Sequence, residues 1–325
     1  MTALKRSELD EVGPDLLSTT EFQQAMLRAL GGRPRTIAPK YFYDHHGASL
    51  FQRICQLDEY YLTRTETAIL REQAPHFAQL AGARADLVEF GAGSFDKARI
   101  LLGALPSPAR YVPIDLATER FDIAGRDLER AYPGLVVAPL AADFAERLTL
   151  PARRQGDGRR VGLFLGSTIG NLSPAQARAF LAGAAAELSG GGLLVGVDLV
   201  KDPGLLHRAY NDAQGITAAF NRNLLDRANR ELGADFDLSS FDHYAFYRPE
   251  EHRIEMHLVS SRRQTVHLGG HAFEFAQGES LHTENSYKYT IEGFRALAGE
   301  AGFMPGPVWC DREQRFSVHW LTSQR

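Results

Sequence analysis

From about residue 86 the chain alternates short apolar segments with amphipathic helical stretches, and this alternation limits the possible folds more than any other feature. A strand that is apolar along its whole length is typical of a parallel sheet covered by helices on both faces. The expected strands are DLVEF, RYVPIDL, LVVAPLAADF, VGLFLGSTIG and GLLVGVDLV. The pattern therefore predicts an α/β fold built on a doubly wound parallel sheet.

Two alternating segments near the C-terminus, PGPVWC and FSVHWLTS, predict an antiparallel hairpin. A helix over TIEGFRALAGEAGF precedes them, and Ser173 and Pro174 predict the start of another helix between the last two parallel strands. An antiparallel strand that closes an otherwise parallel sheet is typical of the Rossmann-like sheet of class I methyltransferases. Such sheets bind their ligand at the carboxyl ends of the strands.

Two regions do not follow this alternation, namely residues 1 to about 75 and residues about 202 to 285. The second region contains a helical stretch over residues 212–232 and then RIEMHLVS, TVHLG and HAFEF, which predict a small antiparallel sheet. We expect residues 1–75 and 202–285 to form a smaller α+β substrate-binding domain, with lid-like character. Residues 76–201 and 286–325 then form the cofactor-binding methyltransferase domain.

Composition narrows the classes of partner. The formal net charge is −4, from 36 basic and 40 acidic residues, and this balance provides no basic surface for nucleic acid or an anionic membrane. Cys55 and Cys310 are too few for a disulfide framework or a thiolate metal site, and the eleven histidines show no metal-binding spacing such as HExxH. The first sixteen residues lack the apolar core of a secretion signal. We therefore expect a cytoplasmic monomer with a small-molecule substrate and no metal.

The segment LVEFGAGSFDK bends at Gly91 and Gly93, between the first strand and its helix. The dinucleotide fingerprint Gly-x-Gly-x-x-Gly requires a third glycine where this chain has Asp96. An acid beside the start of the helix disfavours a pyrophosphate, which binds to bare amides. The bend therefore predicts a nucleoside ligand without phosphate.

Carboxylates follow the next two strands. Asp115 can accept from both hydroxyls of a ribose, and Asp143 can accept from an adenine amino group beside the ring of Phe144. S-adenosylmethionine (SAM) carries a sulfonium cation and no phosphate, so these residues favour SAM as the cofactor. Lys97, on the first helix, is either a solvated side chain or a partner for the methionine carboxylate of SAM.

Seven motifs extend along almost the whole chain. They are PKYFYD at 39–44, LDEYYLTRTE at 57–66, LFLGSTIGNL at 163–172, DLVKDPG at 198–204, RAYNDAQGITAAFNRN at 208–223, RIEMHL at 253–258 and FAQGESLHTENSYKY at 275–289. With these motifs the chain resembles the histidine-specific, SAM-dependent Nα-methyltransferases of ergothioneine biosynthesis. Several motifs lie outside the predicted cofactor sheet, so the resemblance extends beyond a shared fold.

The resemblance implies roles for named residues. The implied SAM contacts are Gly91, Lys97, Asp115, Asp143 and Phe144. The implied histidine contacts are Tyr60, Asn171, Tyr210, Glu284 and Ser286, to which we add Phe51, Gly166, Thr217 and Met256. Tyr43, Tyr60 and Asn171 are the catalytic candidates. Glu284 and Ser286 are two residues apart on an extended segment, so both can meet an imidazole ring.

The implied reaction is three successive methylations of L-histidine to Nα,Nα,Nα-trimethylhistidine, called hercynine. The attacking amine must be neutral, and Tyr43, Tyr60, a water molecule or direct loss to solvent can take its proton. Three alternatives remain: a related methyltransferase of another, aromatic amino acid, a nicotinamide-dependent oxidoreductase, and a non-catalytic SAM-binding module. The chain also departs from the family pattern at Tyr41, in the GAGSFDK bend and at Asn285.

Overall fold

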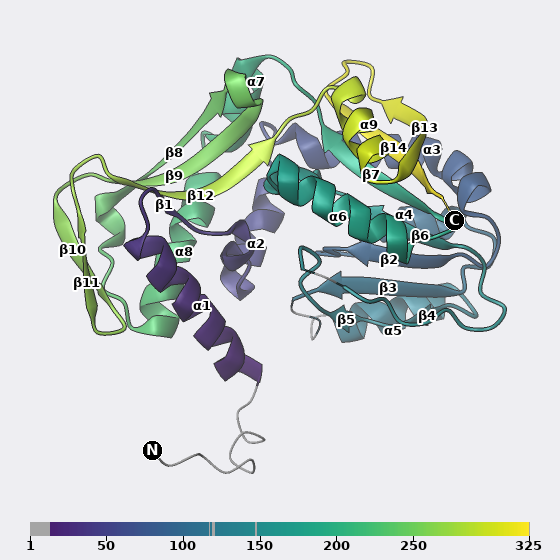
Figure 1. Ribbon diagram of the computed structural model, residues 1–325, viewed down its shortest axis with the longest axis horizontal. Helices are drawn as coiled ribbons and strands as arrows, with labels where there is room; N and C mark the ends of the chain where they lie inside the picture. The colour runs from purple at the N-terminus through teal and green to yellow at the C-terminus, as the bar shows by residue number, and fades with distance from the viewer. Residues whose placement is uncertain (1–13, 117, 119–120, 147, 325) are drawn as a thin grey trace, which may run out of the picture. The chain divides into compact units, whose positions relative to one another are not determined.

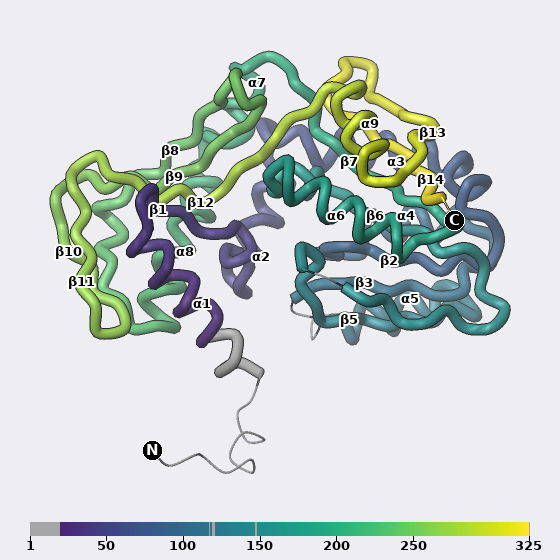
Figure 2. The backbone as a smooth tube through the Cα atoms, in the orientation of Figure 1, coloured from purple at the N-terminus to yellow at the C-terminus, as the bar shows by residue number. Residues whose placement is uncertain are grey.

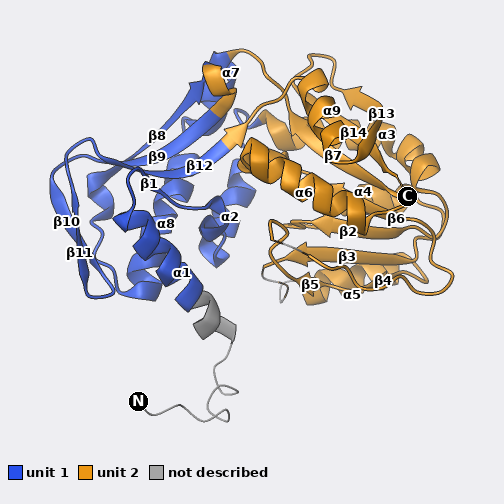
Figure 3. Ribbon diagram, in the orientation of Figure 1, with its two compact units in different colours: residues 1–60, 203–249, 254–285 blue, residues 61–202, 250–253, 286–325 orange. Residues whose placement is uncertain are grey.

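The computed structural model describes residues 14–116, 118, 121–146 and 148–324, so most of the N-terminal segment considered above lies outside the described residues. The chain divides into two compact units, shown in different colours in Figure 3. Unit 1 is formed by residues up to 60, 203–249 and 254–285, and unit 2 by 61–202, 250–253 and 286–325. The continuous tube in Figure 2 shows that the chain leaves and re-enters each unit.

Unit 2 contains one large sheet. Its strands are β2 (Asp86–Phe90), β3 (Arg110–Asp115), β4 (Val136–Val137), β5 (Leu140–Ala141), β6 (Arg160–Phe164), β7 (Gly192–Asp198), β13 (Phe303–Cys310) and β14 (Phe316–Ser323). The order is β13-β14-β7-β6-β2-β3-β4, with β5 also on β3. β14 is antiparallel to β7 and to β13, whereas the remaining pairs are parallel. This topology confirms the predicted doubly wound sheet and its closing hairpin.

Helices cover both faces of this sheet (Figure 1). They are α3 (Tyr61–Ala81), α4 (Asp96–Ala104), α5 (Phe121–Ala131), α6 (Pro174–Glu187) and α9 (Ile291–Glu300), with the short 3-10 helix η3 (Thr168–Asn171). Phe180 of α6 and Phe294 of α9 join the core of one face, and Phe77 of α3 packs on Trp320 of β14. β2, β6 and β7 are buried along their whole length, so most of their residues are apolar, and the buried charged exceptions are Asp86, Glu89, Arg160 and Asp198.

Two predicted helices of unit 2 are confirmed, and for the first of them the predicted start at Ser173 and Pro174 is confirmed as well. Ser173 and Gln176 form a capping box at the start of α6, and Thr290 accepts from the Gly293 amide at the start of α9. The prediction of a single strand over LVVAPLAADF is wrong, because the structure has the short strands β4 and β5 on either side of Pro139. Proline has no amide hydrogen to donate to a strand ladder, so it interrupts the pairing.

Unit 1 combines helices with two small sheets. Its elements are α1 (Pro14–Gly31), β1 (Arg35–Thr36), η2 (Pro39–Phe42), α2 (His45–Ile54), α7 (Pro203–Tyr210), α8 (Ile216–Leu232), η4 (Leu238–Ser240), β8 (Phe241–Arg248), β9 (Arg253–Ser260), β10 (Gln264–Leu268), β11 (His271–Phe275) and β12 (Ser280–Tyr287). The 3-10 helix η5 (Pro249–Glu251) connects β8 and β9, and the last residues of β12 belong to unit 2. Within the described residues, no helix has both the length and the apolar character needed to cross a membrane.

The prediction of one small antiparallel sheet in unit 1 is partly wrong. RIEMHLVS forms β9 in a four-stranded sheet of order β1-β12-β9-β8, whereas β10 and β11 pair only as a separate antiparallel hairpin. Gly269 and Gly270 connect that hairpin with positive φ angles of 57° and 79°, which make a tight local turn. The helix predicted from residue 212 begins at Ile216, because the Asp212 carboxylate accepts from the amides of Ile216 and Thr217.

Candidate functional site

The glycine bend of unit 2 connects β2 to α4. Gly91 and Gly93 have φ angles of +72° and +45°, a region that favours glycine. The amides of Gly91 and Ala92 donate to the carbonyl of Ile114 at 2.9 and 3.0 Å, which fixes the bend to the end of β3. A Cβ on Gly91 would lie 3.0 Å from Cε1 of Phe144. The bend therefore brings the backbone into close contact with this aromatic ring.

Both predicted carboxylates lie at the same end of the sheet. Asp115 is the last residue of β3, and its Oδ2 accepts from the Gly93 amide at 3.3 Å. Asp143 follows β5 and accepts from the amide of Ala145 at 2.9 Å. The structure thus gathers Gly91, Asp115 and Phe144, as the sequence predicts for the edge where strands β2, β3 and β5 end.

Lys97 is not a solvated side chain, because only 19% of it is exposed and its ammonium pairs with Glu66 of α3. The Glu66 side chain is fully buried, and its oxygens accept from the amide of Gly166 at 2.8 and 2.9 Å. A Cβ on Gly166 would lie 3.3 Å from Nζ of Lys97. Sequence reasoning missed Glu66, although it is the last residue of the LDEYYLTRTE motif.

Glu89, on β2 before the bend, is a buried acid that accepts a short hydrogen bond from the Tyr111 hydroxyl. Burial raises the pKa of Glu89 to about 8, although the Tyr111 hydrogen bond and the Lys97 ammonium act in the opposite direction. Glu89 is therefore largely protonated at neutral pH. Glu89 lies in the predicted strand DLVEF, where its sequence context indicated no role.

The predicted aromatic substrate residues of unit 1 form one continuous cluster. The ring centroids of Tyr43 and Phe51 are 5.5 Å apart, those of Phe51 and Tyr60 6.3 Å, and those of Tyr60 and Tyr210 6.4 Å. Phe220 of α8, which was not predicted, completes the cluster at 5.5 Å from Tyr43. An assembly of aromatic faces can accommodate a cation such as a methylated ammonium.

Tyr60 is buried at the centre of this cluster. Burial, together with the nearby hydroxyl of Tyr210, raises the pKa of Tyr60 well above its ordinary value. Its phenol is therefore protonated at neutral pH and suits hydrogen bonding better than proton abstraction. Tyr43 is more accessible, with 37% of its surface exposed.

Met256, Thr217 and Glu284 occupy defined positions in unit 1. Met256 is buried on β9, and its carbonyl accepts from the Thr283 hydroxyl of β12 at 3.0 Å. Thr217 is buried in the first turn of α8. Glu284 lies on β12, as the predicted extended segment requires, next to Asn285, whose buried Oδ1 has no hydrogen-bond partner among the described residues.

Asn171 and Ser286 lie close together in unit 2. Asn171 ends η3, and the preceding Gly170 packs so closely that a Cβ there would lie 2.8 Å from the Tyr287 carbonyl and 3.5 Å from Oγ of Ser286. The Ser167 hydroxyl, before η3, accepts from the Asp198 amide at 3.0 Å. The turn after β6 is therefore fixed both to β7 and to the end of β12.

A buried ionic cluster, which sequence reasoning missed, lies at the end of β7. Asp198 accepts from the Tyr61 hydroxyl at 2.9 Å with both oxygens, pairs with Lys201, and pairs with Lys288 at 2.8 Å. Burial alone would raise the pKa of Asp198, but the two ammonium groups outweigh it and lower the pKa. Burial lowers the pKa of Lys201 to about 8 against the opposing effect of Asp198.

Three potential metal-ligating side chains meet on the unit 1 sheet. One ligand atom each from Glu255, His257 and His282 lies within 4.8 Å of the others. The two imidazole rings are stacked with centroids 4.5 Å apart and planes 10° apart. Because nitrogen lone pairs lie in the ring planes, those of parallel rings do not converge on one ion. In this arrangement the cluster is a stacked pair, in which His257 contacts the carboxylate of Glu255 at 3.0 Å.

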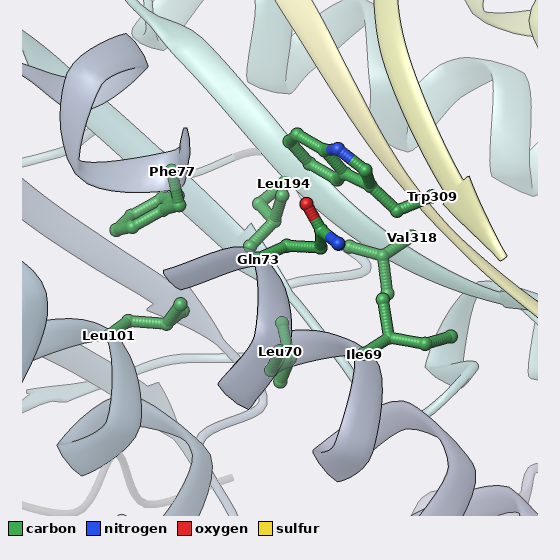
Figure 4. Close-up of a pocket in the computed structure, with 8 residues that line it drawn as sticks. All are labelled: Ile69, Leu70, Gln73, Phe77, Leu101, Leu194, Trp309 and Val318. Carbon is green, nitrogen blue, oxygen red and sulfur yellow. The ribbon is translucent and has the colours of Figure 1, made fainter. Parts of the chain in front are cut away.

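A small pocket opens beneath α3 in unit 2 (Figure 4). The described residues that line it are Ile69, Leu70, Gln73, Phe77, Leu101, Leu194, Trp309 and Val318. None of these side chains is charged, and Gln73 alone carries an amide, so the pocket cannot pair with the ionic groups of SAM or an amino acid. It is a packing feature of the helix and sheet.

Comparison with known proteins identifies the family of the chain. A family model described as histidine-specific methyltransferase, SAM-dependent, matches residues 22–323. The chain is 44% identical over 295 residues to a histidine N-alpha-methyltransferase of Mycolicibacterium smegmatis, covering 89% of this chain and 91% of that protein. It is 41% identical over 292 residues to a histidine N-alpha-methyltransferase of Mycobacterium tuberculosis, covering 88% and 89%.

A more distant relative is the ergothioneine biosynthesis protein 1 of Neurospora crassa, which is 29% identical over 323 residues. That match covers 93% of this chain but 34% of the fungal protein. The family model covers nearly the whole chain, including the motifs outside the cofactor sheet. The chain therefore belongs to the SAM-dependent, histidine-specific methyltransferases.

Proposed function

We propose that the protein transfers methyl groups from SAM to the α-amino nitrogen of L-histidine, as a step of ergothioneine biosynthesis. The observation that carries this function is the family match over residues 22–323, with 44% identity to a histidine N-alpha-methyltransferase over most of both chains. The glycine bend, with carboxylates and no third glycine, supports a nucleoside without phosphate as the cofactor.

SAM, when bound, supplies an electrophilic methyl group on a sulfonium. Asp115 is proposed to hold its ribose, since this carboxylate ends β3 beside the bend. Asp143 and Phe144 are proposed to hold the adenine, and Lys97 the methionine carboxylate. Every residue in this proposal lies in unit 2.

Histidine is proposed to bind through both of its ends. Glu284 and Ser286 would contact the imidazole, while Asn171 and Tyr210 would donate to the carboxylate. Phe51, Tyr60, Thr217 and Met256 would surround the ligand, and Gly166 would approach it with its backbone.

Catalysis would consist mainly of positioning the neutral amine, an effect that can lower a barrier by about 7–11 kcal/mol. Asn171 would orient the amine, and the aromatic cluster of Tyr43 and Tyr60 would accommodate the charge as methyl groups accumulate. Because the pKa of Tyr60 is raised, the amine proton would leave to water or through the more exposed Tyr43. Three rounds would yield hercynine, and we propose that the enzyme acts as a cytoplasmic monomer.

Mass spectrometry tests this function directly. The protein is incubated with SAM and each of the twenty amino acids in turn, and products are followed over time. We expect histidine alone to gain one, two and three methyl groups. Growth of an aromatic amino acid instead would favour the related methyltransferase, and SAM binding without any turnover would favour a non-catalytic module. Binding of a nicotinamide dinucleotide in place of SAM would favour an oxidoreductase.

A further inference from the structure

Lys288 places a cation inside unit 2, two residues after Ser286. Its side chain is fully buried, and its Nζ donates to Oγ of Ser286 at 2.7 Å and pairs with Asp198 at 2.8 Å. A buried ammonium is costly unless it is paired and hydrogen bonded, so these contacts hold Lys288 in one position.

Asp198 keeps Lys288 in place from the other side. Its carboxylate also accepts from Tyr61 at 2.9 Å and pairs with Lys201, and its own amide is bound to Ser167. Asp198 is completely buried, so bulk water does not compete with these partners for its carboxylate. The ammonium of Lys288 is therefore held in place, and its hydrogen bond determines how the Ser286 hydroxyl is oriented.

This geometry fixes the polarity of Ser286. An ammonium has hydrogen-bond donors and no acceptor, so the Ser286 oxygen accepts from Lys288 and its own hydrogen must point elsewhere. Beside a cation, the hydroxyl becomes a stronger donor and a weaker acceptor for a further N–H group. Ser286 itself is 3% exposed, and its oxygen lies near Gly170, next to Asn171.

We propose that Lys288 is a positioning residue that makes Ser286 a hydrogen-bond donor to the imidazole of histidine, and so selects the neutral ring with an unprotonated nitrogen facing Ser286. This inference rests on the proposed function, in which Ser286 contacts the imidazole. An imidazolium has N–H groups at both nitrogens and would meet donor with donor. Indole has only an N–H donor, so the same arrangement rejects tryptophan.

Steady-state kinetics of Lys288→Met test the proposal. Loss of the ammonium should raise KM for histidine about tenfold while kcat changes less than about twofold, since one charge-assisted hydrogen bond is weakened in binding. In the variant, Ser286 can turn and accept. The kcat/KM of the variant divided by that of the wild type, measured at several pH values, is called the pH ratio. It should rise as pH falls through the imidazole pKa of about 6.5. The α-amine titrates in both enzymes, so its contribution cancels in this ratio.

Two further variants separate positioning from stability. Lys201→Met removes the other ammonium on Asp198, at the opposite oxygen, and should lower stability without changing KM or the pH ratio. Ser286→Ala should show the same rise in the pH ratio, and Lys288→Met should add little to it in the double variant. If Lys288→Met does not fold, Ser286→Ala still tests the proposal. A pH ratio of Ser286→Ala that does not change with pH overturns it.

Failure of the proposed function and failure of the inference about Lys288 give different results. A wild-type enzyme that transfers no methyl group to histidine overturns the proposed function and this inference with it. Histidine turnover with an unchanged KM and pH ratio in Lys288→Met overturns the inference alone. An equal effect of Lys201→Met on KM would also overturn it, since the cluster would then act only through stability.

Discussion

Replacing Glu66 with Gln tests the energetics of the Lys97 pair. The fully buried carboxylate accepts from the Gly166 amide at 2.8 and 2.9 Å and pairs with Lys97, whose side chain is 19% exposed. Glutamine has one oxygen and one NH2 group, so either the NH2 group or a neutral oxygen faces the ammonium in place of a carboxylate. A hydrogen bond to a charged group contributes about 1.5–3 kcal/mol, and breaking a buried ion pair costs about 3–5 kcal/mol. Since water can reach Lys97, we expect the free energy of unfolding to fall by about 2–4 kcal/mol.

Urea unfolding followed by circular dichroism measures this change, with Glu72→Gln as the matched control. Glu72 lies on the same helix but is exposed, so its replacement should change the free energy of unfolding by less than about 0.5 kcal/mol. If Glu66→Gln loses no more stability than Glu72→Gln, the buried pair does not stabilise the fold and the reasoning fails.

Three further predictions concern the cofactor, the substrate and pH. Asp115→Ala should weaken SAM binding about 10–100-fold in calorimetry, whereas the exposed Asp127→Ala should not; normal affinity in Asp115→Ala would rule out the ribose contact. Glu284→Ala should lower kcat/KM for histidine by up to about 10⁴, with the exposed Glu274→Ala as control, and unchanged kinetics would reject the imidazole contact. Burial raises the pKa of Glu89 to about 8, so the folded protein keeps a proton that the unfolded chain loses above about pH 4.5. The contribution of Glu89 to the free energy of unfolding therefore falls as pH rises from about 5 to 8. Glu89→Gln should remove that decline in urea unfolding at several pH values, and an equally steep decline in the variant would contradict the assignment.

Local signals predicted the glycine bend and the strand end of the proposed cofactor site, and one nearby helix start. The two glycines of the bend, the strand-terminal Asp115 and the helix start at Ser173 each require only a few neighbouring residues, so their sequence patterns were sufficient. The break in LVVAPLAADF also had a visible signal in Pro139, which the apolar composition around it obscured.

The remaining features depend on contacts between distant parts of the chain. Glu66 reaches Lys97 and Gly166, which are 31 and 100 residues away, only because α3 packs beside the sheet. Lys288 and Asp198 are likewise brought together by the tertiary fold. In single-sequence terms each is an ordinary charged residue, for which a solvated surface position is the default expectation. Only the structure shows that these residues are buried and which charged groups they contact.

The position of the transferred methyl group tests the central claim most directly. Tandem mass spectrometry and NMR of the first histidine product distinguish a methyl on the α-amino nitrogen from a methyl on either ring nitrogen. If the imidazole is bound by Glu284 and Ser286 while the amine is aligned for transfer, every methyl group should be on the α-nitrogen. A product methylated on the imidazole would contradict the account.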